Sequence, residues 1–186
     1  MLIDHHREKL INAIVFFLRN TKYCGKTKLF KLLYLLDFMD FRATARSVSG
    51  LEYYAWEMGP VPMDLYSELD CPKEDLCQYV FIPKSKELKE FFDMKPRKAF
   101  DDLYFNPREL RLLKTLTEIF KEAKAEDMIE VTHLPNAPWD KTLKEKGRLQ
   151  EIDYLLALDD GKDSLSLEEI QERLGDAQEM KEAFGP

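Results

Sequence analysis

A few residues in this chain have the types that could support catalysis or nucleotide binding. Gly25-Lys26-Thr27 matches the end of a phosphate-binding loop, whose backbone amides surround phosphate oxygens. That motif needs another glycine five residues earlier, and this position holds Asn20. The preceding segment also has helical periodicity where the motif requires a strand. Nucleotide hydrolysis is therefore not predicted.

Nucleophilic and metal chemistry have equally little support. Cys24 and His133 could form a nucleophile and its base, but any chain with a few residues of each type offers such a pair. We expect His133 to be buried or to cap a helix. His5 and His6 lie near the start of the chain, and no HExxH motif or dispersed ligand set is present. No metal ligand is predicted.

Two acidic pairs, Asp101-Asp102 and Asp159-Asp160, could bind a metal or act as acid and base. Neighbouring residues of a strand point to opposite faces, and neither pair lies in a glycine-rich calcium loop. We interpret both pairs as solvated turns. The sequence thus predicts no catalytic residue, no cofactor and no enzyme; an enzyme of an unrecognised type stays the weakest alternative.

A segment suited to recognition runs from Tyr54 to Pro62, with the sequence YAWEMGPVP. Gly59 can adopt a positive φ, whereas Pro60 and Pro62 fix their own φ and favour an extended residue before them. A rigid corner with Trp56 just ahead of it is expected. Aromatic side chains held at low entropic cost suit a binding surface. Trp56 could equally fill the core, and both roles are compatible.

Two long helices are expected to position this corner. Asp4 is placed to cap the first, which runs to about Asn20. The second covers about Lys26 to Phe41, and its apolar residues occupy two adjacent stripes. Such a wide apolar arc predicts a helix buried on two sides at the centre of the core.

Shorter elements complete the prediction. One strand is expected over residues 50–61, leading into the corner, followed by a helix from Met63 to Leu69. Further short elements are strands at residues 79–83 and 96–105 and a helix at residues 85–92. The fold class predicted is α+β and mostly helical: a single helical domain with a small antiparallel β-sheet.

Capping signals mark the helices of the second half. Asn106, followed by proline, predicts a strong helix start, and a shorter helix is expected from Ala125 to about His133. Residues 135–139 read as a proline-framed aromatic loop. Ser166 to Glu169 form a capping box, and we expect the helix that it opens to end near Gly175.

The composition is that of a folded chain in a reducing compartment. The 186 residues are 45% hydrophobic, and an odd set of three cysteines has no CxxC spacing. The longest apolar run, residues 10–18, is too short to span a bilayer and lacks a cleavage site after it. We expect a cytoplasmic protein without a membrane partner.

The net charge of −7 is concentrated at the C-terminus. Residues 159–186 hold nine acidic and three basic side chains, so the remaining chain is nearly neutral. We therefore divide the chain into a domain over residues 1–158 and an acidic helical C-terminal extension over residues 159–186. A neutral body has no bulk attraction to phosphate. Five basic residues could still form a local patch, although we interpret them as a solvated helix face: Arg19, Lys22, Lys26, Lys28 and Lys31.

Several motifs together resemble one known family. They are the run from Lys28 to Asp37, which contains the KLLY motif, the YAW segment at residues 54–56, and the Gly-Pro-Val-Pro corner at residues 59–62. The PREL run at residues 107–110 and the pairs at residues 132–133 and 138–139 continue the resemblance. In order and spacing these motifs resemble the Panacea domain, found in SocA-like antitoxins and GepA-like phage-associated proteins. The resemblance covers about residues 5–155 and leaves out residues 84–102 and the tail.

The resemblance implies an antitoxin of a bacterial or phage toxin–antitoxin pair. Such a protein binds a cognate protein toxin encoded by a neighbouring gene and blocks it directly or delivers it to a protease. The residues that we expect to bind the partner, around a groove beside the corner, are Tyr34, Tyr54, Trp56, Gly59, Pro60, Val61, Pro62, His133 and Trp139. A proteolytic adaptor or interaction module and a DNA-binding operon regulator stay as alternatives.

Overall fold

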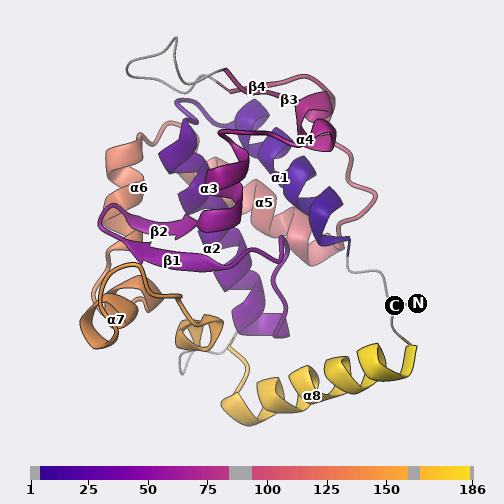
Figure 1. Cartoon of the computed structure of the whole chain (residues 1–186), viewed down its shortest axis with the longest axis vertical. Coiled ribbons are helices and arrows are strands. Elements are labelled where there is room, and N and C mark those ends of the chain that lie inside the picture. Colours follow the sequence, from indigo (N-terminus) through magenta and orange to yellow (C-terminus); the bar gives the residue numbers. More distant parts are fainter. Residues whose placement is uncertain (1–4, 84–93, 159–163, 185–186) are drawn as a thin grey trace.

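Helix α2 (Lys26–Thr44) is the centre of the structure. The computed structural model describes residues 5–83, 94–158 and 164–184. Helices α1 (His6–Asn20) and α5 (Pro107–Phe120) pack against α2, and the β1–β2 hairpin lies across another of its sides (Figure 1). Twelve of the nineteen residues of α2 are buried. The prediction of a helix buried on two sides is confirmed, and α6 and a short 3-10 helix, both described below, also contact α2.

The hairpin consists of β1 (Tyr53–Trp56) and β2 (Gly59–Pro62), paired antiparallel from Tyr53 opposite Pro62 to Trp56 opposite Gly59. The prediction of one continuous strand over residues 50–61 was wrong. The chain reverses at Glu57-Met58, a turn without the usual Asn-Gly signal, and Gly59 with a φ of 101° completes it. The predicted rigid corner is thus the second strand of a hairpin.

Asp37 of α2 fixes the segment that enters the hairpin. Its buried carboxylate accepts hydrogen bonds from the backbone amides of Val48 and Ser49 at 2.9 and 2.8 Å and from the Tyr53 hydroxyl at 2.7 Å. The Ser49 hydroxyl donates as well. Burial raises the pKa of Asp37 to about 6, and these hydrogen bonds oppose the shift. The central helix therefore determines where β1 begins.

A second small sheet pairs β3 (Val80–Phe81) with β4 (Lys95–Pro96). Helix α3 (Met63–Glu68) was predicted, whereas α4 (Glu74–Tyr79) was not. The strand expected over residues 96–105 is wrong beyond Pro96. Mostly helical secondary structure with small antiparallel sheets confirms the predicted α+β class, with two sheets in place of one among the described residues.

Helix α5 begins as predicted. The Asn106 side chain accepts from the amides of Arg108 and Glu109, the Glu109 carboxylate accepts from the Asn106 amide at 2.8 Å, and Pro107 occupies the first helical position. Glu109 also pairs with Lys9 of α1 at 2.7 Å. The same cap therefore starts α5 and ties it to α1.

The chain ends with α6 (Ala125–Thr132), α7 (Pro138–Glu145), the 3-10 helix η1 (Tyr154–Ala157) and α8 (Leu167–Phe184). Two expectations were wrong. Residues 138 and 139 start a helix rather than finish a loop, and α8 continues through Gly175, where a Cβ would meet open space. The capping box at Ser166 is confirmed. Asp4, Asp159-Asp160 and the helix predicted at residues 85–92 fall on residues outside the described ones.

Within the described part of the chain, none of the helices combines the length and the apolar composition that crossing a membrane requires. The apolar residues of α1 instead face the core: Leu10, Ile14 and Phe17 are all buried.

Candidate partner-binding site

The KLLY run and the Gly-Pro corner meet in the fold. Lys31 of α2 is 1% exposed, and its ammonium donates a hydrogen bond to the Pro60 carbonyl at 3.0 Å. Gly59 leaves room for it: a Cβ at this position would lie 2.5 Å from Lys31 Nζ and 3.1 Å from His133 Nε2. A glycine is therefore required both by its positive φ and by the lysine packed beneath it.

Burial changes the acidity of Lys31. It lowers the pKa of the ammonium to about 7. Lys28, one turn earlier on α2, is also buried, but its ammonium donates to three carbonyls, those of Lys22, Phe120 and Ala123, at 2.7, 2.7 and 2.6 Å. Among the residues that the structure describes, Lys31 has one such acceptor. Burial lowers the pKa of Lys28 as well, so the two lysines differ in the number of carbonyls that accept from them and not in the direction of the shift.

His133 and Trp139 close the other side of the corner. Their rings stack with centroids 3.8 Å apart and planes 5° apart. The Trp139 indole N–H donates to the Trp56 carbonyl at 2.9 Å, which ties α7 to β1. His133 Nε2 is buried without a hydrogen-bond partner in the described chain. Burial, and next the nearby Lys31 ammonium, lower the pKa of His133, so the imidazole is neutral at pH 7.

Tyr34 lies deeper in the same region. Its ring is 3% exposed and packs on Phe38 at 4.3 Å and on Tyr53 at 5.5 Å. Burial raises the pKa of the phenol well above its usual value, and the Trp139 backbone close to the hydroxyl opposes this shift. Tyr34 therefore belongs mainly to the core.

The outer face of β1 carries the accessible aromatic side chains. Along this strand Tyr53 and Ala55 are buried, and Tyr54 and Trp56 point to the other side and are half-buried. Trp56 packs against Tyr66 of α3 at 5.2 Å. Of the nine residues that the sequence predicted for partner binding, six are buried: Tyr34, Gly59, Pro60, Val61, Pro62 and Trp139. Tyr54, Trp56 and His133 are half-buried, and the ring of His133 stacks on buried Trp139.

Sequence reasoning did not find two contributors to this face. Met58, at the tip of the hairpin, is 59% exposed, and Lys26 lies over the Tyr66 ring at 3.8 Å. A hairpin turn at Glu57-Met58 would have pointed to Met58. The role of Lys31 was missed as well, although a lysine inside an apolar helical stripe is itself an unusual signal.

The basic patch considered from the sequence does not form a free cationic face. Lys28 and Lys31 are buried, so the expectation of a solvated face was wrong for them. Arg19 donates to the Lys98 carbonyl, and Lys22 pairs with Glu122 at 3.0 Å. These cations serve internal contacts.

The candidate catalytic groups are not assembled for chemistry. Burial raises the pKa of the Cys24 thiol to about 11, the opposite of what a nucleophile needs. Gly25 follows a helix rather than a strand, which is not the context of a phosphate-binding loop. Asp101 and Asp102 lie in an exposed turn, and the described ranges contain no group of three acidic, His or Cys side chains that could hold a metal.

Comparison with known proteins decides the family. Residues 29–140, more than half of the chain, match the family described as "Antitoxin SocA-like, Panacea domain". The chain belongs to this family. The match includes Lys31, the hairpin and Trp139, so the residues that meet at the corner all lie inside the SocA-like domain. No curated protein and no solved structure matches the chain. Membership in an antitoxin family implies a cognate toxin as partner.

Proposed function

We propose that this SocA-like protein is the antitoxin of a bacterial or phage toxin–antitoxin pair and neutralises its cognate protein toxin by direct binding in the cytoplasm. The observation that carries the proposal is the outer face of the β1–β2 hairpin, in a chain of an antitoxin family. Tyr54, Trp56 and Met58 form this hairpin face. Rigid, partly exposed aromatic side chains are the usual anchors of protein interfaces.

The mechanism is occlusion by a braced surface. Lys31 holds the Pro60 carbonyl from below, and Trp139 holds the Trp56 carbonyl from the side, so both strands are fixed before a partner arrives. Preorganisation lowers the entropic loss on binding. An apolar segment of the toxin then packs on the hairpin face, and loss of a central aromatic anchor weakens such a complex by about 2 kcal/mol or more.

We assign binding to the domain over residues 1–158 and treat residues 159–186 as an extension of that domain. No cofactor or membrane is part of the proposed action. A protease would take part only if the protein acted as an adaptor, and nucleic acid only if it regulated its own operon. Both alternatives predict readouts different from those of a stable inhibitory complex.

The test is co-expression with the product of the neighbouring reading frame. Growth arrest by the neighbour alone, rescue by this protein and co-purification of the two at unchanged toxin levels would support direct binding. Rescue with falling toxin levels would instead support a proteolytic adaptor. A shift of the upstream promoter fragment with a steep salt dependence would support a DNA-binding regulator.

Trp56→Ala localises the surface, with Ile119→Ala as the matched control. Ile119 is 64% exposed on α5, a helix that is not among the main contacts of the hairpin. We expect Trp56→Ala to weaken co-purification while unfolding stays cooperative and Ile119→Ala to leave it unchanged. Equal toxin binding by both variants would remove the hairpin face from the proposal, and loss of cooperative unfolding would make Trp56 a core residue.

A further inference from the structure

Three carboxylates surround Tyr54 on the hairpin face. Glu52 precedes Tyr54 by two residues at the entry to β1, and the Tyr54 hydroxyl donates to its carboxylate at 3.4 Å. Glu151 lies directly opposite Tyr54 in an antiparallel bridge, which places the two side chains next to each other. Asp64 lies in the first turn of α3, which follows β2 directly. We call Glu52, Asp64 and Glu151 the acidic rim.

The acidic rim is exposed and carries uncompensated charge. Desolvation, and then the negative charges of Glu52, Glu151 and Asp64, raise the pKa of the Tyr54 phenol. Within the described ranges none of these three carboxylates forms an ion pair, whereas Glu57 at the hairpin turn pairs with Arg148 at 3.5 Å. Three negative charges thus lie around one half-buried aromatic ring, and the described part of the chain supplies no cation to them.

A neighbouring ring shows the same arrangement with its cation in place. Lys26 Nζ lies 3.8 Å from the centre of the Tyr66 ring and 3.5 Å from the Asp70 carboxylate. Tyr66 packs on Trp56 with ring centroids 5.2 Å apart, so this group borders the hairpin face. The face of an aromatic ring attracts an ammonium or guanidinium group, and a carboxylate nearby adds to the attraction. Tyr54 has the ring and the carboxylates, and the cation is what a partner can add.

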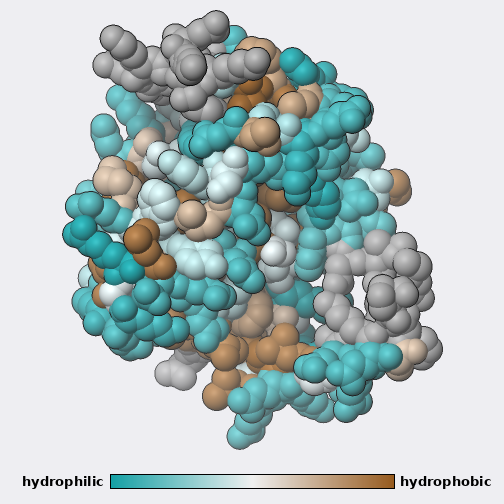
Figure 2. All heavy atoms as spheres, viewed as in Figure 1, coloured by the Kyte–Doolittle hydropathy of each residue, from teal (hydrophilic) through white to brown (hydrophobic). Residues whose placement is uncertain are grey.

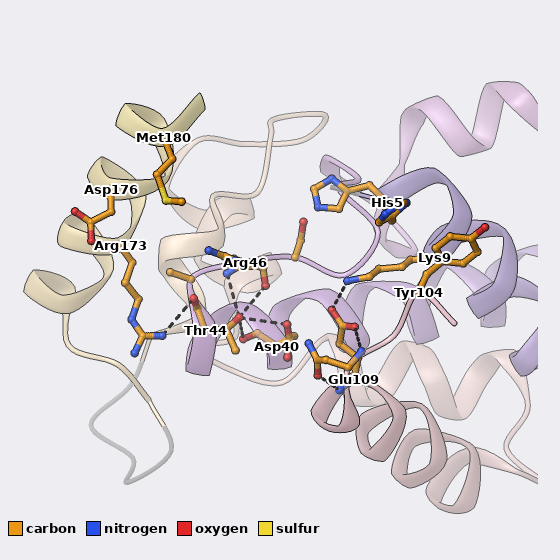
Figure 3. Close-up of a pocket in the computed structure, with 14 residues that line it drawn as sticks. His5, Lys9, Asp40, Thr44, Arg46, Tyr104, Glu109, Arg173, Asp176 and Met180 are labelled. Atoms are coloured by element: carbon orange, nitrogen blue, oxygen red, sulfur yellow. Dashed lines mark hydrogen bonds and ion pairs between the residues drawn. The ribbon is translucent and has the colours of Figure 1, made fainter. Parts of the chain in front are cut away.

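The largest charged cleft of the described structure lacks this property. It holds about 610 Å³ beside α8, and two of its carboxylates are already paired within the chain (Figure 3): Glu109 with Lys9 at 2.7 Å and Asp40 with Arg108 at 3.0 Å. The hairpin face differs in composition as well. Figure 2 shows pale atoms of intermediate hydropathy over β1 and β2, bordered by hydrophilic side chains. The aromatic side chains and the acidic rim are therefore parts of one surface.

We propose that the hairpin face binds a cationic segment of the cognate toxin, with a lysine or arginine side chain on the Tyr54 ring inside the acidic rim. This inference rests on the proposed antitoxin function and specifies the chemistry of the partner. Charge complementarity selects the occupant, because the rim offers three carboxylates without a counter-ion. Apolar residues beside the toxin cation pack on Trp56 and on Met58, which is 59% exposed.

Surface plasmon resonance tests the proposal, with the product of the neighbouring reading frame as the probe. Glu52→Gln, Asp64→Asn and Glu151→Gln together neutralise the acidic rim. We expect the dissociation constant to rise about tenfold, mostly through slower association. Raising the salt concentration from about 50 to 300 mM should weaken binding by the wild type and have much less effect on this rim variant.

The matched control neutralises one aspartate and two glutamates outside the hairpin and α3. Asp102→Asn, Glu118→Gln and Glu172→Gln change the net charge by the same amount, and all three residues are exposed. We expect this control variant to bind like the wild type. Circular dichroism checks the fold of both triple variants.

Substitutions of Tyr54 report on the ring itself. Tyr54→Phe keeps the aromatic face and should bind like the wild type. Tyr54→Leu keeps an apolar side chain but removes the ring, so its dissociation constant should rise at least about threefold. Equal binding by the leucine and phenylalanine variants would remove the cation from the Tyr54 ring and overturn the proposal.

The other outcomes separate this inference from the proposed function. Absence of a complex with the wild type would overturn both. A complex that Trp56→Ala weakens and the rim variant leaves unchanged would overturn this inference alone. Equal weakening in the rim and control variants would indicate a general effect of net charge and would also overturn it. If the rim variant lost only self-association of the chain, a second copy would be the occupant in place of the toxin.

Discussion

Replacing Lys31 with methionine should stabilise the protein at neutral pH. The side chain is 1% exposed, and burial lowers the pKa of its ammonium from 10.5 to about 7. Between these two pH values the unfolded chain binds a proton that the folded chain lacks, so the free energy of unfolding rises with pH. At pH 7 this difference in the Lys31 pKa between the folded and the unfolded chain lowers the free energy of unfolding of the wild type by about 4 kcal/mol.

Part of that gain is offset in the variant. The Pro60 carbonyl loses its donor, which costs about 1–3 kcal/mol for a buried group. We therefore expect Lys31→Met to be more stable than the wild type by about 2 kcal/mol at pH 7. Because the wild type gains about 2 kcal/mol between pH 7 and pH 9, the difference should nearly vanish at pH 9.

Urea unfolding of both proteins at the two pH values measures this difference, and Lys28→Met is the control. Removing Lys28 leaves three carbonyls without their donor, so that variant should lose about 3 kcal/mol or more at either pH. A Lys31→Met variant less stable than the wild type at pH 7, or a difference that does not change with pH, would refute the reasoning.

Two further predictions concern the same corner. In urea unfolding, Gly59→Ala should destabilise the protein by about 2 kcal/mol more than Gly147→Ala. Both glycines have a positive φ, but only at Gly59 would an added Cβ lie 2.5 Å from Lys31 Nζ. Equal losses of stability in the two variants would contradict this prediction. His133 has a lowered pKa, so stability should fall as pH drops below its ordinary 6.5, where the unfolded imidazole takes up a proton first. His133→Phe, which keeps a ring on Trp139, should show a smaller drop in melting temperature between pH 7.5 and 5.5, and an identical drop in both proteins would count against it.

The sequence was sufficient where local signals and the fold agreed. The apolar arc of α2 and the Asn106 cap of α5 are strong signals, because each strongly favours a helix and the fold agrees with it. The hairpin was missed because Glu57-Met58 is not a typical turn pair. Pro138 suggested a loop, although proline is equally favoured in the first turn of a helix.

The support of the site depended on contacts that no local pattern encodes. The composition rule that lysine stays at the surface fails for Lys31, whose acceptor lies 29 residues further along the chain. The hydrogen bond of the Trp139 indole is equally long-range in sequence, because its acceptor, the Trp56 carbonyl, lies 83 residues earlier. The motifs were sufficient to predict the family, but the structure is needed to show which of the motif residues are buried beneath the hairpin and which are accessible on its outer face.

The bond from the Trp139 indole to the Trp56 carbonyl also has a consequence for synthesis of the protein. The hairpin leaves the ribosome first, but the side chain that braces it follows 83 residues later. At a translation rate of about 5–20 residues per second, that interval is about 4–17 seconds. During this time the hairpin of a nascent chain lacks the Trp139 hydrogen bond, and the surface that we propose for recognition is complete only after α7 has emerged.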